Sequence, residues 1–151
     1  MKRSPELTPL SHDHHEALFV AQRLKRAEDA GDARERFLAF WRSHGRGHFA
    51  IEEDILLPGW VENDADADRT AAARLAAEHL EIRSEARRLD RGAAVELEQL
   101  HRLGTLLESH VRFEERELFP AIESALGADA IARLGEEIAA AEAGMREARA
   151  T

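Results

Sequence analysis

An eleven-residue stretch that contains metal-ligand side chains occurs twice in this sequence. The first copy pairs His48 with Glu52, and the second copy pairs His110 with Glu114, so each carboxylate follows its histidine by four residues. On an α-helix, residues four apart lie on one face, about 6 Å apart along the axis. Each copy therefore points an imidazole and a carboxylate in the same direction, and two such pairs facing each other would enclose a metal ion.

The two copies are offset by 62 positions, from His48 to His110, which indicates two related helical hairpins. Each hairpin then needs a matching residue on its first helix. His14 and His79 take that place, since each is in phase with the apolar positions of its own helix. The side chains that we expect to face the core and hold metal are His14, His48, Glu52, His79, His110 and Glu114.

Six polar side chains at one level of an apolar core call for a cation, because each buried polar group without a partner costs about 1–3 kcal/mol. Imidazole and carboxylate suit first-row metals such as iron, manganese or zinc, and bridging carboxylates suit two ions about 3.5 to 4 Å apart. Two ions would leave positive charge for a small anion or for dioxygen. The absence of cysteine excludes thiolate-based metal sites.

Apolar residues recur at helical spacing along the chain and predict an all-α fold. Short connections favour an up-and-down antiparallel four-helix bundle, here with an additional C-terminal helix. We expect a single domain over residues 1–151, with the bundle over about 8–125 and the last helix over about 128–149. The bundle helices are expected at about 8–30, ended by Gly31-Asp32; 33–57, ended by Pro58-Gly59; 68–91; and 93–120, with an acidic loop over 60–68.

Composition narrows the classes of partner. The formal net charge of −9 argues against nucleic acid, because no basic stripe is present to displace counterions from phosphates. No apolar run approaches the roughly 20 residues that span a bilayer, and the first residues lack the apolar core of a signal peptide. We therefore expect a cytoplasmic protein with no membrane association.

The chain resembles the hemerythrin-like, or HHE cation-binding, family over residues from about 10 to 120. The resemblance implies a four-helix bundle around a non-haem diiron centre of two iron ions, which binds dioxygen, nitric oxide or iron itself. It also implies that the glutamates of the two repeated stretches bridge the ions and that the four histidines are terminal ligands. The motifs that carry the resemblance are Asp13-His14-His15, His48-x-x-x-Glu52-Glu53, Glu78-His79 and His110-x-x-x-Glu114-Glu115.

Two departures separate the chain from the oxygen-carrying members of that family. Those proteins have a second histidine four residues after the ligand of the third helix, where this chain has Arg83. They also have an aspartate, after a longer gap, where this chain has Glu114. We expect Arg83 to bond Glu53 or Glu115, with pairing to an anion beside the metals as the alternative.

Other histidines and carboxylates near the motifs receive different roles. His15 is about 100° around the helix from His14 and is expected at the rim. His44 lies one turn before the second-helix ligand; we expect a core or rim role, with a further ligand or an access path as the alternative. Glu53 and Glu115 are expected to accept imidazole N–H groups. His12 and His101 are expected to be solvated.

Three functions are compatible with these features. The first is a diiron protein that binds dioxygen, nitric oxide or iron for sensing, storage or scavenging. The second is a diiron oxidase, peroxidase or nitric oxide reductase, which would need an external reductant, since no flavin, nicotinamide or phosphate-binding motif is present. The third is a metal-free helical interaction module. In each case the C-terminal helix could contact a protein partner or a second copy of the chain.

Overall fold

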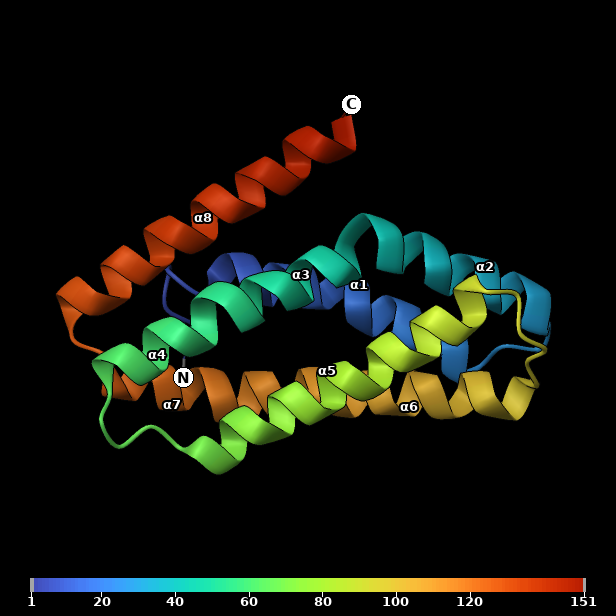
Figure 1. Ribbon diagram of the computed structural model, residues 1–151, viewed down its shortest axis with the longest axis horizontal. Helices are drawn as coiled ribbons and strands as arrows, with labels where there is room; N and C mark the ends of the chain where they lie inside the picture. Colours follow the sequence, from blue (N-terminus) through green and yellow to red (C-terminus); the bar gives the residue numbers. More distant parts are fainter. Residues whose placement is uncertain (1, 151) are drawn as a thin grey trace.

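Residues 2–150, which the computed structural model describes, form helices connected by short loops and contain no strand (Figure 1). The predicted all-α bundle with an extra C-terminal helix is confirmed. The elements are α1 (Thr8–Lys25), α2 (Ala30–Phe40), η1 (Trp41–Gly45), α3 (Arg46–Ile51), η2 (Glu52–Leu56), α4 (Leu57–Asn63), α5 (Arg69–Asp90), α6 (Leu97–Phe113), η3 (Glu114–Leu118), α7 (Phe119–Ala125) and α8 (Ala128–Ala150).

Two of the four bundle helices contain π-helical turns. The second bundle helix runs from α2 through η1, α3 and η2 to α4, and the fourth runs from α6 through η3 to α7. The expectation that Pro58 ends the second helix was wrong, because α4 continues to Asn63. Pro58 and Pro120 are each the second residue after a π-turn, which ends at Leu56 and Leu118 respectively. The regular i→i−4 hydrogen bonding is already interrupted there, so the missing N–H of proline is tolerated.

The acidic loop is consequently shorter than expected and begins only after α4. Trp60 belongs to that helix and is 1% exposed. Its indole Nε1–H donates to Asp64 Oδ2 at 3.0 Å, which satisfies the one polar group of the buried ring. Burial of this ring therefore keeps residues 60–63 in the helix, although the acidic composition of 60–68 predicted a loop.

The first turn of the bundle also differs from the expectation. The first helix ends at Lys25, and Gly31 and Asp32 lie inside α2 rather than in a turn. Asp29 is the N-cap of α2, because its Oδ1 accepts a hydrogen bond from the backbone N–H of Asp32 at 3.0 Å. The capping aspartate, rather than the glycine, marks the boundary.

The apolar core is divided into two clusters along the bundle axis. One cluster contains Phe37, Trp41 and Leu103 and fills the end where α1, α2, α5 and α6 meet. The other contains Trp60 and Phe119 and fills the end formed by α4, α7 and α8. Along each bundle helix, the predicted ligand histidine lies near the boundary between the two apolar clusters. A polar layer therefore crosses the bundle between two apolar regions.

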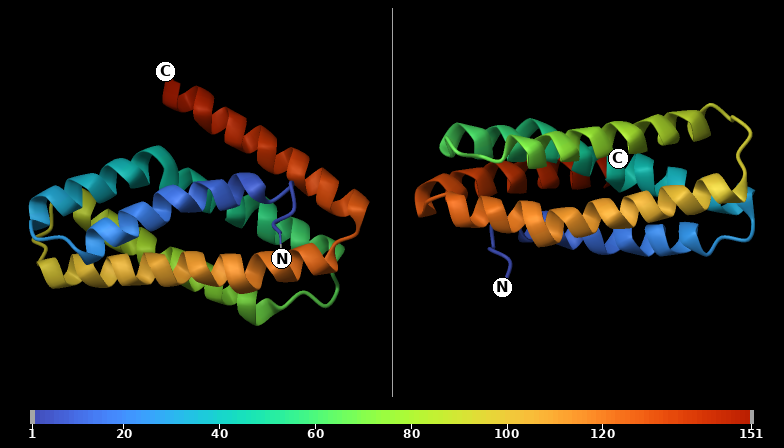
Figure 2. Two further views of the ribbon diagram at one scale, coloured as in Figure 1. Left: turned by 180° about the vertical axis from the view of Figure 1, so that it is seen from behind. Right: turned by 90° about the horizontal axis from the view of Figure 1, so that it is seen from below.

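The C-terminal helix α8 crosses the bundle obliquely, and its ribbon diverges from the other helices toward its C-terminal end (Figures 1 and 2). Its buried apolar side chains Leu134 and Ile138 belong to the second cluster. A Cβ added to Gly47 would lie 2.5 Å from Met145 Cε, so this glycine permits the close helix contact. The apolar face of α8 thus packs on its own chain.

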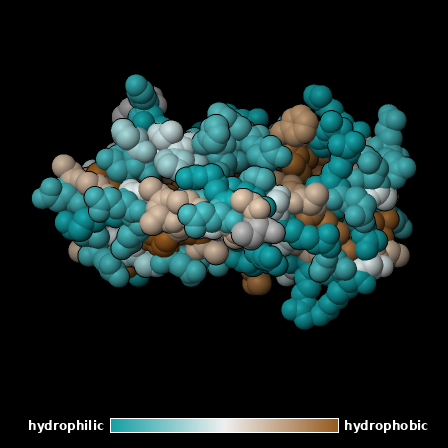
Figure 3. Space-filling view, turned by 90° about the horizontal axis from the view of Figure 1, so that it is seen from above, coloured by the Kyte–Doolittle hydropathy of each residue, from teal (hydrophilic) through white to brown (hydrophobic). Residues whose placement is uncertain are grey.

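The face seen from above is covered mainly by hydrophilic side chains, and its apolar side chains lie in small separate groups (Figure 3). This pattern is ordinary for a protein surface that water contacts. Among residues 2–150, no helix carries an apolar stretch long enough to cross a bilayer.

The closest backbone approach between α1 and α6 provides a test of the packing. A Cβ added to Gly104 would lie 2.8 Å from both the Ala21 carbonyl oxygen and Leu24 Cβ. We predict that Gly104→Ala lowers the free energy of unfolding by about 1–3 kcal/mol, because backbone has to move. Gly144 has nothing within 4 Å of an added Cβ. Gly144→Ala should be neutral or stabilising by up to about 1 kcal/mol in the same denaturant titration.

Candidate metal centre

Each bundle helix contributes one buried histidine to the polar layer, and the second and fourth bundle helices each add a glutamate. The imidazoles of His14, His48, His79 and His110 are all buried. Glu52 and Glu114 are 0% exposed. The structure therefore brings all six predicted side chains together in the middle of the bundle.

The six side chains form two sets of four donors that share both glutamates. The two sets are His14, His48, Glu52 and Glu114; and His79, His110, Glu52 and Glu114. The ligand atoms in each set lie within 4.8 Å of one another.

The two oxygens of each glutamate face different sets. Glu52 Oε2 lies 3.3 Å from His48 Nε2, and Glu52 Oε1 lies 3.2 Å from His79 Nε2. Glu114 Oε2 lies 3.0 Å from His14 Nε2, and Glu114 Oε1 lies 2.5 Å from His110 Nε2. One oxygen per donor set is the arrangement that a carboxylate needs in order to bridge two ions.

Eight polar atoms of this layer make no hydrogen bond within residues 2–150: the four imidazole Nε2 atoms and the four carboxylate oxygens of Glu52 and Glu114. Buried polar atoms are normally satisfied, and those left over call for a ligand. First-row metals take imidazole nitrogen and carboxylate oxygen at about 2.0–2.2 Å. The donor types and their convergence fit two such ions.

A carboxylate on a neighbouring helix fixes the orientation of each imidazole. In every case the ring Nδ1–H donates to this outer carboxylate, which leaves Nε2 directed at the polar layer. The four pairs are His14 with Glu115 Oε2 at 2.7 Å, His48 with Asp13 Oδ2 at 3.0 Å, His79 with Glu53 Oε2 at 2.7 Å, and His110 with Glu78 Oε1 at 2.8 Å. The predicted roles of Glu53 and Glu115 as acceptors are thereby confirmed.

Both shared glutamates occupy the first position of a π-turn, Glu52 in η2 and Glu114 in η3. A π-turn adds a residue to the helical turn and changes the direction of the side chains that follow. The helix can thus present a histidine and a glutamate inward and still bury Leu56 or Leu118 in the next turn. Helical periodicity in the sequence does not reveal this shift.

A sequence profile of the hemerythrin HHE cation-binding domain matches residues 7–122. The chain belongs to this family. Comparison with curated proteins and with solved structures gave no match. Family membership and the buried cluster of histidine and glutamate together identify a metal-binding HHE domain. The match leaves α8 outside the domain.

Arginines from two parts of this HHE domain bind the outer carboxylates. Arg83 donates to Glu53 Oε2 at 2.9 Å, as expected. On the opposite side, Arg3 Nη2 donates to the Glu115 carbonyl at 2.7 Å and lies 3.3 Å from Glu115 Oε1. The residue that replaces the additional histidine of oxygen carriers therefore holds an outer carboxylate, and Arg3 repeats that contact for the other hairpin.

The remaining histidines lie outside the two donor sets. His12 and His15 are exposed, and their rings contact each other. His44 Nδ1 lies 2.7 Å from Ser43 Oγ, and the side chain lines a small cavity beside the centre. His101 is half-buried and its Nε2–H donates to the Ala27 carbonyl at 2.9 Å. The expectation that His101 is solvated was therefore only partly correct.

Three residues near the centre were not given a role from the sequence. Asp13 and Glu78 each precede a ligand histidine and accept from the histidine of a neighbouring helix. Their place directly before His14 and His79 in both hairpins was the available signal. Glu142, on α8, lies beside Asp13 and is buried. Nothing in the repeated motif points to it.

A small cavity adjoins the first donor set. Its volume is about 20 Å³, enough for one water-sized molecule. Ala17, Phe40, Leu107 and Val111 contribute apolar walls, and the candidate ligands His14, His48, His110 and Glu114 also line it. His79 does not line it; instead the ring of Phe49 stacks on the His79 imidazole at 3.7 Å between centroids.

Without metal, the two sets of carboxylates control the charge of the imidazoles. Burial lowers the pKa of His110, but Glu114 and Glu78 outweigh burial and raise that pKa to about 10. The pKa values of His14, His48 and His79 are also raised, for the same combination of reasons. Burial opposes ionisation of Glu114, yet the nearby imidazoles hold its pKa well below the usual value.

We predict that the metal-free protein loses stability as the pH rises. A histidine whose pKa is higher in the folded protein than in the unfolded chain stabilises the folded protein. The stabilisation is complete when the pH is below the unfolded-state pKa, near 6.5. For His110 it disappears as the pH approaches the folded-state pKa of about 10. The free energy of unfolding of chelator-treated protein should fall by about 3–4 kcal/mol between pH 6.5 and 9.5, since each pH unit corresponds to about 1.4 kcal/mol for one group. Equal stability at the two pH values, measured by urea titration, would show that the imidazoles are not charged.

Proposed function

We propose that this HHE domain holds a non-haem diiron centre that binds a small diatomic or anionic ligand, such as dioxygen or nitric oxide, for sensing, storage or scavenging. The observation that carries the proposal is the placement of Glu52 and Glu114, each with one oxygen toward each pair of histidines. Two ions bridged by these carboxylates would each have two imidazole and two carboxylate donors. Manganese and zinc are the alternatives that the same donors would accept.

Charge favours two multiply charged cations in this layer. The two shared glutamates and the four outer carboxylates give six acidic groups around the centre. Two ferric ions carry six positive charges, and two ferrous ions carry four. Outer carboxylates that accept the Nδ1–H groups make the imidazoles stronger donors. This environment supports both oxidation states and favours the higher one.

The chain's donors leave room for a further ligand on each ion. Iron commonly takes up to six ligands, and each donor set supplies four. The apolar cavity beside His14 and His48 limits what can bind to a molecule of two or three atoms. Two of the three ligand histidines that line the cavity, His14 and His48, belong to the first set, and the third is His110. We therefore assign exogenous ligands to the ion held by His14 and His48.

The bound ion supplies the redox and ligand-binding chemistry, and the protein supplies orientation and a dry site. Ring Nδ1–H donation to Asp13 and Glu115 keeps the imidazole Nε2 atoms of His48 and His14 directed inward, where they would bind the metal ion in place of a proton. Ala17, Leu107 and Val111 exclude bulk water from the cavity side.

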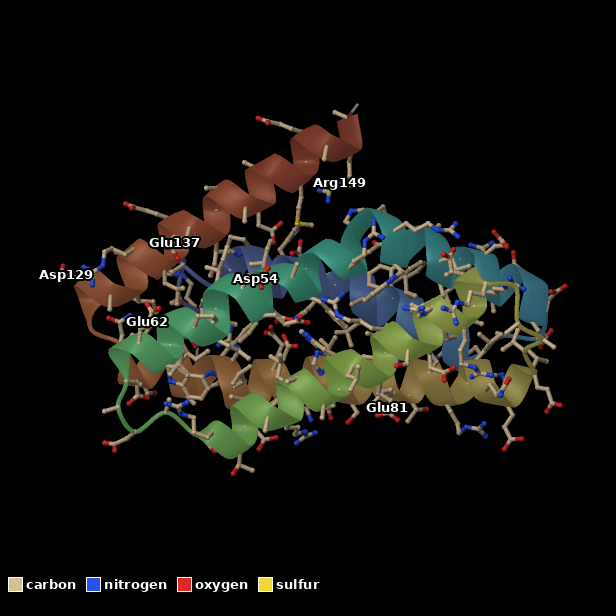
Figure 4. All side chains as sticks on the ribbon, in the orientation of Figure 1. Asp54, Glu62, Glu81, Asp129, Glu137 and Arg149 are labelled. Atoms are coloured by element: carbon tan, nitrogen blue, oxygen red, sulfur yellow. The ribbon has the colours of Figure 1, made fainter. Side chains whose placement is uncertain are left out.

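Removal of one bridge is the decisive test of a two-iron centre. Wild-type protein loaded anaerobically with ferrous iron and passed through a gel-filtration column, which removes loosely held metal, should contain two irons per chain by elemental analysis. Glu52→Ala should lose both irons, because Glu52 contributes to both donor sets. Glu62→Ala, at an exposed carboxylate away from the centre (Figure 4), should retain both. Loss of only one iron in Glu52→Ala would reject the bridge.

The cavity assignment is tested with azide. After oxidation in air, added azide should give a near-ultraviolet charge-transfer band if an ion has an open position. We expect Ala17→Leu, which fills the cavity, to weaken azide binding by about tenfold or more with unchanged iron content. Ala139→Leu adds the same atoms at an exposed position of α8 and should bind azide like the wild type. Equal azide affinity in both variants would place the ligand elsewhere.

A further inference from the structure

A buried carboxylate on α8 lies outside the matched HHE domain and next to its metal ligands. Glu142 is 5% exposed. Its carboxylate, the carboxylate of Asp13 and a ring nitrogen of His48 offer ligand atoms that all lie within 4.8 Å of one another. Asp13 already accepts from His48 Nδ1–H at 3.0 Å. Two carboxylates and one imidazole therefore converge on the outer side of His48.

Packing alone does not explain this carboxylate. The apolar side chains Leu134, Ile138 and Met145 already hold α8 against the bundle. Glu142 Oε1 has no hydrogen-bond partner among residues 2–150, which is an unfavourable state for a buried carboxylate oxygen. Burial and the neighbouring carboxyl of Asp13 raise the pKa of Glu142 to about 8. The position thus brings together two acidic groups that repel each other unless a proton or a cation lies between them.

We propose that Asp13, His48 and Glu142 form a capture site that takes up ferrous iron before it enters the two-iron centre. This inference rests on the proposed function above. Two carboxylate oxygens and one imidazole nitrogen are a suitable donor set for a first-row divalent cation, with water completing the coordination. Ligand atoms bound at about 2.1 Å lie up to about 4.2 Å apart, so shifts of a few tenths of an ångström close the site.

The two sides of the His48 ring connect the capture site with the centre. Nδ1 faces Asp13, and Nε2 faces Glu52 at 3.3 Å. A cation held at Nδ1 by Asp13 and Glu142 would take the place of the Nδ1 proton, which would pass to solvent at the exposed edge of Asp13. Once the cation had left this position, Nδ1 would take a proton from solvent and donate to Asp13 again. The two positions therefore use His48 in turn rather than together.

The surroundings of Asp13 provide an entrance and a route. The Asp13 side chain is 21% exposed, so the outer edge of the capture site reaches solvent. Asp13 and His48 also line the small cavity, together with His14, His110 and Glu114. An ion that passes from the capture site into this cavity would therefore meet donors of the two-iron centre.

The loading rate of ferrous iron tests the capture site. Stopped-flow mixing of metal-free protein with anaerobic ferrous iron should give a second-order rate constant about tenfold lower in Glu142→Gln than in the wild type, because a local anionic ligand is removed. The iron content at equilibrium should remain two per chain. Glu137→Gln makes the same charge change on the exposed side of α8 (Figure 4) and should load at the wild-type rate.

Equal loading rates in Glu142→Gln and the wild type would overturn the capture site. Equal slowing in Glu137→Gln would also overturn it, because the effect would then come from net charge. If Glu142→Gln does not fold, Glu142→Met fills the same space without a charge and carries the same expectation. Wild-type protein that takes up no iron at equilibrium would overturn both the diiron proposal and the capture site.

The Glu52→Ala background separates the two proposals. With the centre disabled, one cobalt(II) ion per chain should still bind at the capture site while free cobalt is present, detectable by its visible absorption, and should be lost on gel filtration. Adding Glu142→Gln to Glu52→Ala should abolish that ion, whereas adding Glu137→Gln should not. Absence of any cobalt in Glu52→Ala would overturn the capture site and leave the two-iron centre of the wild type intact.

Discussion

Four imidazoles and two carboxylates cross the core of this bundle between two apolar clusters, and their burial has to be compensated. The outer carboxylates compensate one side of each imidazole through Nδ1. The inner side, with eight polar atoms that make no hydrogen bond within residues 2–150, is left for cations. The apolar clusters supply the stability that tolerates this layer, and α8 completes one of them.

The protein exchanges one form of charge balance for another. In the metal-free state, raised imidazole pKa values place protons where the donors converge. Metal binding replaces those protons, so the same carboxylates stabilise protonated imidazoles in the metal-free protein and cations in the metal-loaded protein. Acid should therefore weaken the metal-loaded form, whereas alkali weakens the empty one. Arg3 and Arg83 each bind one of the outer carboxylates.

The sequence was sufficient to predict that the inner six residues lie together, because a helical spacing of four residues recurs in both halves of the chain. The four-residue spacing of His48 and Glu52 gives one helical face, and its recurrence at His110 and Glu114 gives a second. The roles of Asp13 and Glu78 depend on which helices are neighbours, and that information is absent from spacing along one helix. The predicted end of the second helix at Pro58 was wrong, because a π-turn precedes this proline and the helix continues. Glu142 has no counterpart in the repeat and could be found only from the packing of α8.

The order of the outer hydrogen bonds has a consequence for how the bundle assembles. The histidine of the first bundle helix donates to Glu115 on the fourth, and the histidine of the fourth donates to Glu78 on the third. The histidine of the third donates to Glu53 on the second, and the histidine of the second donates to Asp13 on the first. This closed circuit fixes the axial register of every helix against two others. A chain whose helices had slipped by one turn would present unmatched imidazoles, so stable metal uptake reports that all four helices have reached their correct alignment.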